Sequence, residues 1–152
     1  MSKSTFVYTI YIRTSAERLW EALTTPQFAK QYWFGMHVQT DWKKGSPWQL
    51  LFSDGRVADT GEVVEAEPPR KLVLRWRNEW KPEFKAEGDS VCTMLLEPDN
   101  DAVKLTVTHE MQREGSGLIQ AVSGGWPRIL SNLKSLLETG QPVATALHRP
   151  GA

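Results

Sequence analysis

The sequence predicts an α+β domain in which a curved antiparallel sheet of six to seven strands surrounds one long C-terminal helix. Three observations support this prediction: apolar residues alternate along several segments, two short helical patterns follow the first segment, and a long helical stripe begins near Leu118. One helix is too narrow to cover six or seven flat strands, so the sheet must curl around it. The predicted order is β-α-α-β-β-β-β-β-β-α.

The N-terminal segment reads as a strand followed by two short helices. Residues 5–13 alternate polar and apolar side chains, which is typical of a half-buried strand. Thr14 and Glu17 fit the capping-box pattern and predict a helix that ends near Leu23. Thr25-Pro26 combines a hydroxyl cap with a proline at the first helical position, and therefore predicts a second helix.

Strands and turns fill the stretch from Trp33 to Glu110. Asp54-Gly55 is a two-residue hairpin signal between strands at 48–52 and 57–66. The inward face of 57–66 stays open, because Val63 and Val64 are both apolar. The long connection from Asn78 to Asp89 is of a length that is usually functional or mobile. Further strands are predicted at 71–77, 91–97 and 103–109.

The last predicted element is a long amphipathic helix over about 118–137. Gly140 is expected to cap its C-terminus in the left-handed conformation. Pro127 removes a backbone donor, so we expect a kink or a restart near residues 123–127. The prediction is therefore a single domain over 1–140, followed by a flexible C-terminal tail over 141–152.

Charge and composition exclude several classes of protein. The 152 residues contain 18 Lys and Arg and 18 Asp and Glu, which removes the electrostatic attraction that nucleic-acid and anionic-membrane binders depend on. The N-terminal residues lack the order of a signal peptide, so we expect a cytoplasmic protein. Seven tryptophans are a large number for a chain of this size and favour a binding surface.

Several segments together resemble the START-like (SRPBCC) helix-grip superfamily, over roughly residues 5–138. Within it, the chain is most similar to the bacterial homologues of the C-terminal domain of the heat-shock-protein-90 ATPase activator. The resemblance rests on Tyr11-Ile12, on 17–26, on Gly61-Glu62-Val63-Val64 with Glu67-Pro68-Pro69, on 71–76, and on Gly125-Trp126 before Ile129, Leu130 and Leu133. It implies the helix-grip fold, and its name implies a chaperone-assisting role in stress response.

Strand parity places a candidate ligand site between the sheet and the long helix. The inward-facing positions of the strands, one wall of the long helix and the segment from Trp33 to Met36 would surround it. For most of these side chains we expect core packing. For Trp48, Trp76 and Trp126 core packing and cavity lining both remain open, since each buried indole N–H needs a partner. The candidate residues are Trp33, Trp48, Leu50, Phe52, Trp76, Met94, His109, Trp126, Ile129 and Leu133.

Two features of this site have alternative interpretations. His109 is either a hydrogen-bonded core histidine or a polar anchor for a ligand. The pair Gly124-Gly125 either has a structural role, as a helix joint or a close helix-to-sheet contact, or opens the entrance of the cavity. Catalysis would need a second group near His109; Glu110 points to the other face, and Glu62 converges only in one register of its strand.

No metal or cofactor is predicted. His37, His109 and His148 lie in different elements without ligand spacing, and the sequence contains neither a glycine-rich phosphate loop nor a nucleophile elbow. Cys92 lies among apolar neighbours and reads as a buried, inert thiol rather than a nucleophile.

We therefore hypothesise that the domain binds a small, mostly hydrophobic molecule in a cavity between the sheet and the C-terminal helix. One alternative is a protein-interaction or co-chaperone-like role with a heat-shock chaperone as partner, for which Trp42, Trp80 and Phe84 would form an exposed patch outside the cavity. A further alternative is a cyclase- or hydrolase-like enzyme that uses the same cavity.

Overall fold

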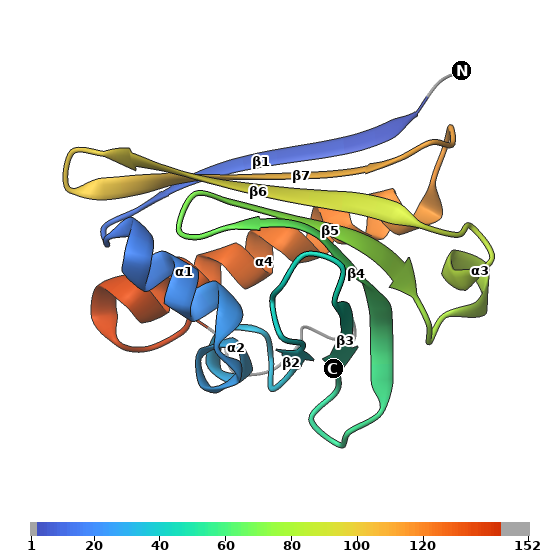
Figure 1. Ribbon diagram of the computed structural model, residues 1–152, viewed down its shortest axis with the longest axis horizontal. Coiled ribbons are helices and arrows are strands. Elements are labelled where there is room, and N and C mark those ends of the chain that lie inside the picture. Colours follow the sequence, from blue (N-terminus) through green and yellow to red (C-terminus); the bar gives the residue numbers. More distant parts are fainter. Residues whose placement is uncertain (1–2, 144–152) are drawn as a thin grey trace.

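The computed structural model describes residues 3–143, which form one seven-stranded antiparallel sheet and four helices (Figure 1). The order of the strands in the sheet is β1-β7-β6-β5-β4-β3-β2. The strands are β1 Ser4–Ile12, β2 His37–Gln39, β3 Pro47–Leu51, β4 Val57–Glu67, β5 Lys71–Asn78, β6 Ser90–Asp99 and β7 Ala102–Met111. The helices are α1 Ala16–Thr24, α2 Pro26–Tyr32, α3 Pro82–Lys85 and α4 Gly117–Thr139. The predicted α+β class and helix-grip arrangement are confirmed.

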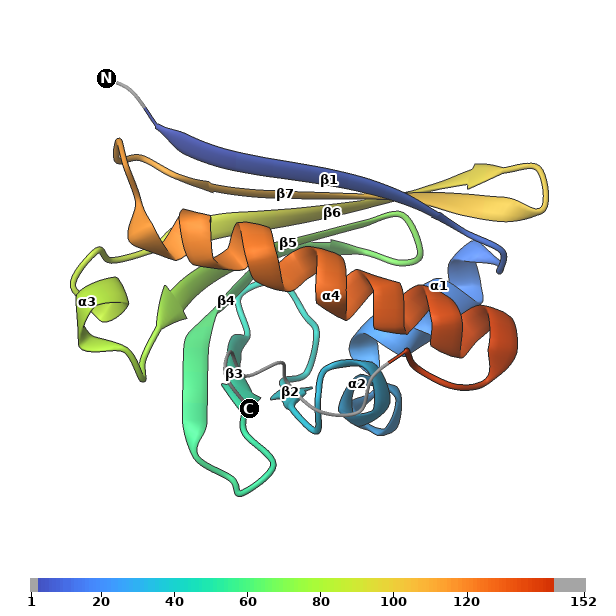
Figure 2. The ribbon, with the colours of Figure 1, turned by 180° about the vertical axis from the view of Figure 1, so that it is seen from behind.

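The long helix α4 runs along one face of the curved sheet, as Figure 2 shows from behind. Helices α1 and α2 lie near the C-terminal end of α4, and α3 lies near its N-terminal end. The core fills the space between the sheet and these helices. No helix among residues 3–143 is both long and apolar enough to span a membrane.

Side chains alternate in burial along the central strands as the period-two pattern predicts. In β5 the side chains of Leu72, Leu74 and Trp76 are buried, and in β7 every second residue from Val103 to Met111 is buried. A bulge between Val63 and Glu65 settles the open question in β4, because it buries Val63 and exposes Val64. The inward face of β4 is therefore fixed by this bulge.

The predicted caps of the two short helices need correction. Ser15, not Thr14, is the N-cap of α1, and its hydroxyl accepts a hydrogen bond from the Arg18 backbone N–H at 3.1 Å. Thr25 precedes α2 as predicted, but its side chain makes no capping hydrogen bond. Its backbone carbonyl accepts the first helical bonds instead, and Pro26 sets the backbone angle of the first helical residue.

Helix α4 is continuous through Pro127, which excludes the restart that was one of the two expectations for residues 123–127. Proline removes a single hydrogen bond, and buried Trp126 and Leu130 hold the helix against the core on this stretch. Gly140 caps the helix with φ +90°, as predicted. Of the predicted tail 141–152, the segment 144–152 lies outside the described residues.

The long connection between β5 and β6 contains the short helix α3, which the sequence-based prediction did not include. Pro82 occupies its first turn, and the backbone N–H groups of Phe84 and Lys85 bond to the Lys81 carbonyl. Helix α3 holds this connection beside the N-terminal end of α4 (Figure 2).

Candidate functional site

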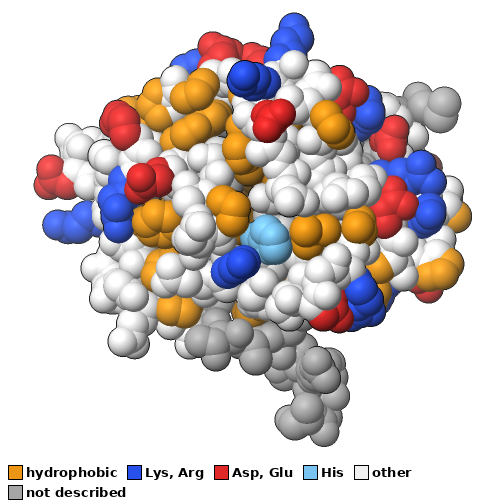
Figure 3. Space-filling view, turned by 60° about the horizontal axis from the view of Figure 1, so that its bottom comes forward, with side chains coloured by type: hydrophobic (Ala, Val, Ile, Leu, Met, Phe, Trp, Pro, Cys, Tyr) orange, Lys and Arg blue, Asp and Glu red, His pale blue; other side chains and the backbone are white. Residues whose placement is uncertain are grey.

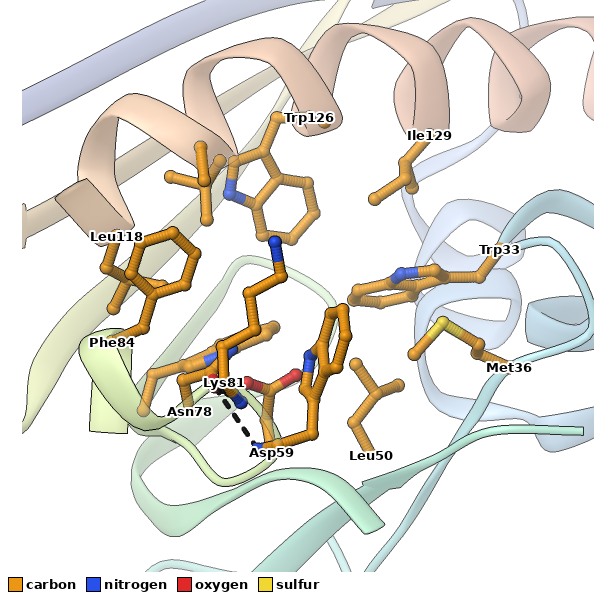
Figure 4. Close-up of a pocket in the computed structure, with 15 residues that line it drawn as sticks. Trp33, Met36, Leu50, Asp59, Asn78, Lys81, Phe84, Leu118, Trp126 and Ile129 are labelled. Atoms are coloured by element: carbon orange, nitrogen blue, oxygen red, sulfur yellow. Dashed lines mark hydrogen bonds between the residues drawn. The ribbon is translucent and has the colours of Figure 1, made fainter. Parts of the chain in front are cut away.

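A pocket of about 230 Å³ lies between α4, the ends of β3, β4 and β5, and the connection that contains α3 (Figure 4). Its wall is mainly aromatic and aliphatic, which is typical of small-molecule sites. The lining residues are Trp33, Met36, Leu50, Asp59, Trp76, Asn78, Trp80, Lys81, Phe84, Leu118, Ala121, Val122, Gly125, Trp126 and Ile129.

Half of the predicted site residues line this pocket. They are Trp33, Leu50, Trp76, Trp126 and Ile129. The other predicted residues, Trp48, Phe52, Met94, His109 and Leu133, are not part of its wall. The periodicities of the strands and of the long helix identify which side chains point inward. They do not identify where these inward side chains pack against each other and where they leave a pocket.

Trp48 and Leu133 are fully packed in the core. The Trp48 ring lies over Gly61, where a Cβ atom would overlap the ring and the Arg75 carbonyl. Its indole N–H donates to that carbonyl at 2.9 Å, so it has no capacity left for a ligand. Met94 borders a second void of only about 10 Å³.

The aromatic rings behind the pocket form one packed cluster. Trp33 lies 5.5 Å from Trp126 and 6.2 Å from Trp76 between ring centroids. Trp76 and Trp126 meet edge to face at 5.9 Å, and Trp48 supports Trp76 from behind at 4.7 Å. Such offset and edge contacts are favourable beyond the burial of area, and they make this wall rigid.

His109 is a core histidine with both ring nitrogens bonded. The Trp126 indole N–H donates to Nδ1 at 3.2 Å, so the proton of the neutral ring is on Nε2. That N–H donates to the Ser90 hydroxyl at 2.8 Å, and the hydroxyl donates to the Trp76 carbonyl at 3.3 Å. Burial lowers the pKa of His109 to about 4, which keeps the ring neutral. Both ring nitrogens of His109 are therefore bonded to protein groups, which leaves neither of them to anchor a ligand.

Asp59 supplies a carboxylate to the pocket, and the sequence analysis did not single it out. Its residue is only 6 % exposed, and its Oδ1 atom has no hydrogen-bond partner among the described residues. Burial raises the pKa of Asp59 to about 7; the Trp76 indole opposes this rise and the charge of Glu79 adds to it. Because Val63 faces inward, the period-two alternation of the strand places Asp59 on the inward face as well. In the sequence this was ambiguous, because Val63 and Val64, at the bulge, are both apolar.

Asn78 pairs with Asp59 across strands β4 and β5 and organises the rim of the pocket. Its side-chain carbonyl accepts from the backbone N–H groups of Trp80 and Lys81, at 3.2 and 2.9 Å. This turn places the Trp80 ring, which is 50 % exposed, at the pocket. The Lys81 ammonium lies 5.1 Å from the centre of that ring and 5.4 Å from the centre of the Phe84 ring.

The predicted aromatic patch outside the cavity does not exist as such. Trp80 and Phe84 belong to the pocket wall, and Trp42 is half-buried against the main core. Phe52, predicted as a lining residue, supports the rim from the side, with its ring 5.5 Å from Trp80 in an edge-to-face contact.

The glycine pair in α4 leaves space rather than making a close contact. A Cβ atom at Gly124 or Gly125 would meet nothing within 4 Å, which excludes close packing against the sheet. Gly125 lines the pocket, whereas Gly124 is exposed and does not. Of the two interpretations of this pair, the geometry favours an opening at Gly125.

Glu87 ties the connection between β5 and β6 to the start of α4. Its carboxylate accepts from the Ser116 hydroxyl at 2.6 Å and from the Gly117 backbone N–H at 2.9 Å. Ser116 also accepts from the Ile119 N–H as the N-cap of α4. Burial would raise the pKa of Glu87, but these hydrogen bonds outweigh it and lower the pKa.

The described residues do not assemble the other chemistries considered. Glu62 lies on the outer face and pairs with Arg75 at 2.9 Å, so it does not converge with His109. Among residues 3–143, no three His, Cys, Asp or Glu side chains cluster as metal ligands. Cys92 is buried, and burial raises the pKa of its thiol, as expected of an inert cysteine.

Basic and acidic side chains occur together on the face of the molecule shown in Figure 3. On the face shown in Figure 3, hydrophobic side chains lie between scattered basic and acidic ones. This face thus offers no single-sign field to a polyanion.

Comparison with known proteins agrees with this architecture. Residues 13–138 match a family model described as "Activator of Hsp90 ATPase homolog 1-like protein". The crystal structure of protein MLL2253 from Mesorhizobium loti has 25% identity and a TM-score of 0.76, with 89% of this chain and 97% of that chain covered. No curated protein matches the sequence significantly.

Two further solved structures show the same fold at lower identity. The Aha1 dimer from Colwellia psychrerythraea has 20% identity and a TM-score of 0.73, with 90% of this chain and 98% of that chain covered. An Hsp90 activator from Plasmodium falciparum has 23% identity and a TM-score of 0.71, with 88% and 95% covered. Because the family model spans most of the sequence, the chain belongs to the family of Activator of Hsp90 ATPase homolog 1-like proteins.

Proposed function

We propose that this protein binds a small, mostly hydrophobic molecule in the pocket between the sheet and α4. The observation that carries the proposal is the open space of about 230 Å³ beneath α4, with three buried tryptophans in its wall. Small-molecule sites are typically concave and mostly apolar with a few polar groups, and this pocket has that character.

The size of the pocket limits the ligand. Sites for drug-sized molecules span roughly 300–1,000 Å³, so this pocket suits a molecule of one or two rings. Burying about 300 Å² of apolar surface would contribute on the order of 7 kcal/mol before the costs of association. The expected affinity is therefore micromolar or weaker unless polar groups add to it.

The experiment that tests this proposal combines native mass spectrometry and calorimetry. Protein purified from its own host is expected to retain a small molecule under native conditions. Titration with one- and two-ring aromatic compounds is expected to give saturable heats with a negative heat-capacity change, the sign of apolar burial. No retained molecule, together with flat titrations across the whole series, would remove the proposal.

A second candidate is an interaction with a heat-shock chaperone, supported by the family to which the chain belongs. The outer face of the sheet carries separate exposed apolar side chains for such a contact, Val7 and Tyr11 on the edge strand β1 and Val91 on β6. Addition of the protein to its host's own Hsp90 is expected to raise the ATPase rate. An unchanged rate at saturating concentration would exclude this role.

A further inference from the structure

The pocket contains a buried carboxylate without a counter-ion. Asp59 is 6 % exposed, and its Oδ1 atom has no hydrogen-bond partner among the described residues. Buried polar groups in native proteins are almost always partnered, and each exception needs an explanation. Because Asp59 lines the pocket, a ligand can supply the missing partner.

The nearby protein cations are engaged elsewhere. Glu79, which adds negative charge near Asp59, lies 3.2 Å from the Lys85 ammonium and 3.5 Å from Arg77. Lys81 lines the pocket, but its ammonium is held over aromatic rings of the rim, and Figure 4 shows its side chain extending toward Trp126 rather than toward Asp59. No ion pair to Asp59 occurs among residues 3–143.

We propose that the occupant of this pocket is a small apolar amine, whose ammonium group donates a hydrogen bond to Asp59 Oδ1 and whose hydrocarbon part packs against the tryptophans. This inference rests on the proposed function. A neutral hydroxyl could fill the same hydrogen bond, but it would leave the carboxylate charge without compensation. Charge-assisted hydrogen bonds are roughly twice as strong as neutral ones, and the indole rings beside the carboxylate favour a cation.

The proposal also fixes how binding depends on pH. Burial raises the pKa of Asp59 to about 7, and an ammonium ligand requires the ionised carboxylate. Below pH 7, binding releases the Asp59 proton to solvent. The affinity for an amine is therefore expected to increase as the pH rises from about 5.5 to 7.5, while an alkylamine with a pKa near that of lysine, about 10.4, stays charged.

Other groups that face Asp59 do not reverse this dependence. The pocket-lining residues of α4, β3 and β5 carry no titratable side chain, and His37 of β2 is not part of the pocket wall. His109, behind Trp76 and Trp126, is neutral in this range because burial lowers its pKa to about 4. Lys81, which also lines the pocket, has its ammonium over the Trp80 and Phe84 rings.

Four probes that share one phenyl ring test the proposal on the unmodified protein. They are 2-phenylethylamine, 2-phenylethanol, ethylbenzene and 3-phenylpropionate, each titrated by calorimetry and followed by the indole N–H resonances in NMR spectra. The amine is expected to bind at least about tenfold more tightly than ethylbenzene, and the acid most weakly. If ethylbenzene or the alcohol equals the amine, the inference is wrong while the proposed function stands. If none of the four binds, both fail.

A matched pair of variants locates the effect. Asp59→Asn keeps the size of the side chain and removes the charge, so the preference for the amine and its pH dependence are expected to disappear. Glu62→Gln removes one charge from the outer face of the same strand and is expected to keep both. An amine preference that survives in Asp59→Asn, with ethylbenzene binding unchanged, would overturn the assignment of Asp59.

Discussion

Gly125 is the residue at which α4 leaves room above the pocket. A side chain at this position would enter open space, because no atom lies within 4 Å of its ideal Cβ position. Glycine inside a helix costs roughly 1 kcal/mol relative to alanine. The protein therefore carries a local cost in helix stability at a position where larger residues would fit.

We predict that Gly125→Leu fills the pocket and weakens ligand binding without destabilising the fold. Leucine is a good helix former, so the free energy of unfolding is expected to stay the same or to increase by up to about 1 kcal/mol. Gly124→Leu is the matched control, since Gly124 is exposed and lies outside the pocket wall. Calorimetric titration and urea unfolding measure the two effects. Equal binding by both variants would show that the ligand sits elsewhere.

The rim of the pocket depends on one turn between β5 and α3. The Asn78 side chain accepts two backbone N–H groups there and is itself buried. Trp80, Lys81 and Phe84 all follow this turn and line the pocket. The position of the rim is thus set by a side chain that is itself almost entirely buried.

Substitution of Asn78 by alanine is expected to loosen this rim. Two backbone donors lose their acceptor, so the free energy of unfolding should fall by about 1–3 kcal/mol. Hydrogen exchange is expected to accelerate for the amides of residues 79–86, while the amides of β7 keep their protection. A uniform loss of protection across all strands would instead mean that Asn78 supports the whole sheet.

Glu87 provides a second anchor for the same connection, at the N-terminus of α4. Its carboxylate is held by Ser116 and Gly117, and the positive end of the helix dipole favours its charge. Because its pKa is lowered in the folded state, it stabilises the fold above its unfolded pKa of about 4.3. This stabilisation disappears as the pH falls through the lower, folded value.

The variant Glu87→Gln is expected to reduce the free energy of unfolding by about 1 kcal/mol at pH 7, a typical value for a lost charged cap. The difference from the unmodified protein should vanish at low pH, where Glu87 is protonated. Urea unfolding at pH 7 and near pH 3 tests this. A difference that persists at the lower pH would assign the effect to shape rather than charge.

The sequence predicted the elements well wherever hydrophobic periodicity was unbroken. Strands β5, β6 and β7 and helix α4 follow from period two and period 3.6, because each buries one face. The caps shifted by one residue at Ser15, since neighbouring Thr14 and Ser15 can both serve as caps. Helix α3 was missed because a four-residue helix has no periodicity.

The site was predicted only in part, for a related reason. The period-two alternation identifies the inward face of a strand, but not which inward side chains are packed in the core and which border the pocket. Trp48 and His109 were therefore candidates beside Trp76. Asp59 was missed because the bulge at Val63 and Glu65 interrupts the alternation on its strand. A buried carboxylate is visible only when the register is known.

At the scale of the whole molecule, two buried groups have opposite effects on stability. Asp59 has a folded pKa raised to about 7 from an unfolded value of about 3.9, so it stabilises the fold at low pH and less as the pH rises between these values. His109 has a folded pKa lowered to about 4 from about 6.5, so its contribution rises with pH over that window. Between about pH 4 and 6.5 the opposite effects of Asp59 and His109 on the free energy of unfolding therefore cancel.

We therefore predict a free energy of unfolding that changes little between pH 4.5 and 6.5. His37, whose pKa is lowered by desolvation and by Lys30, acts in the same direction as His109. In Asp59→Asn the His109 effect is unopposed, and stability is expected to rise with pH by up to about 1.4 kcal/mol per unit. In His109→Gln it is expected to fall instead. Urea unfolding at half-unit steps measures all three profiles, and identical slopes in the two variants would contradict the prediction.

The hydrogen-bond chain from Trp126 through His109 and Ser90 to the Trp76 carbonyl also bears on the cost of binding. It locks the Trp126 rotamer before any molecule arrives, so the ring has little conformational entropy left to lose. Immobilising a free side chain costs about 0.5–1.5 kcal/mol. That cost is confined to the exposed rim around Trp80, and the deep wall is preorganised for whatever enters.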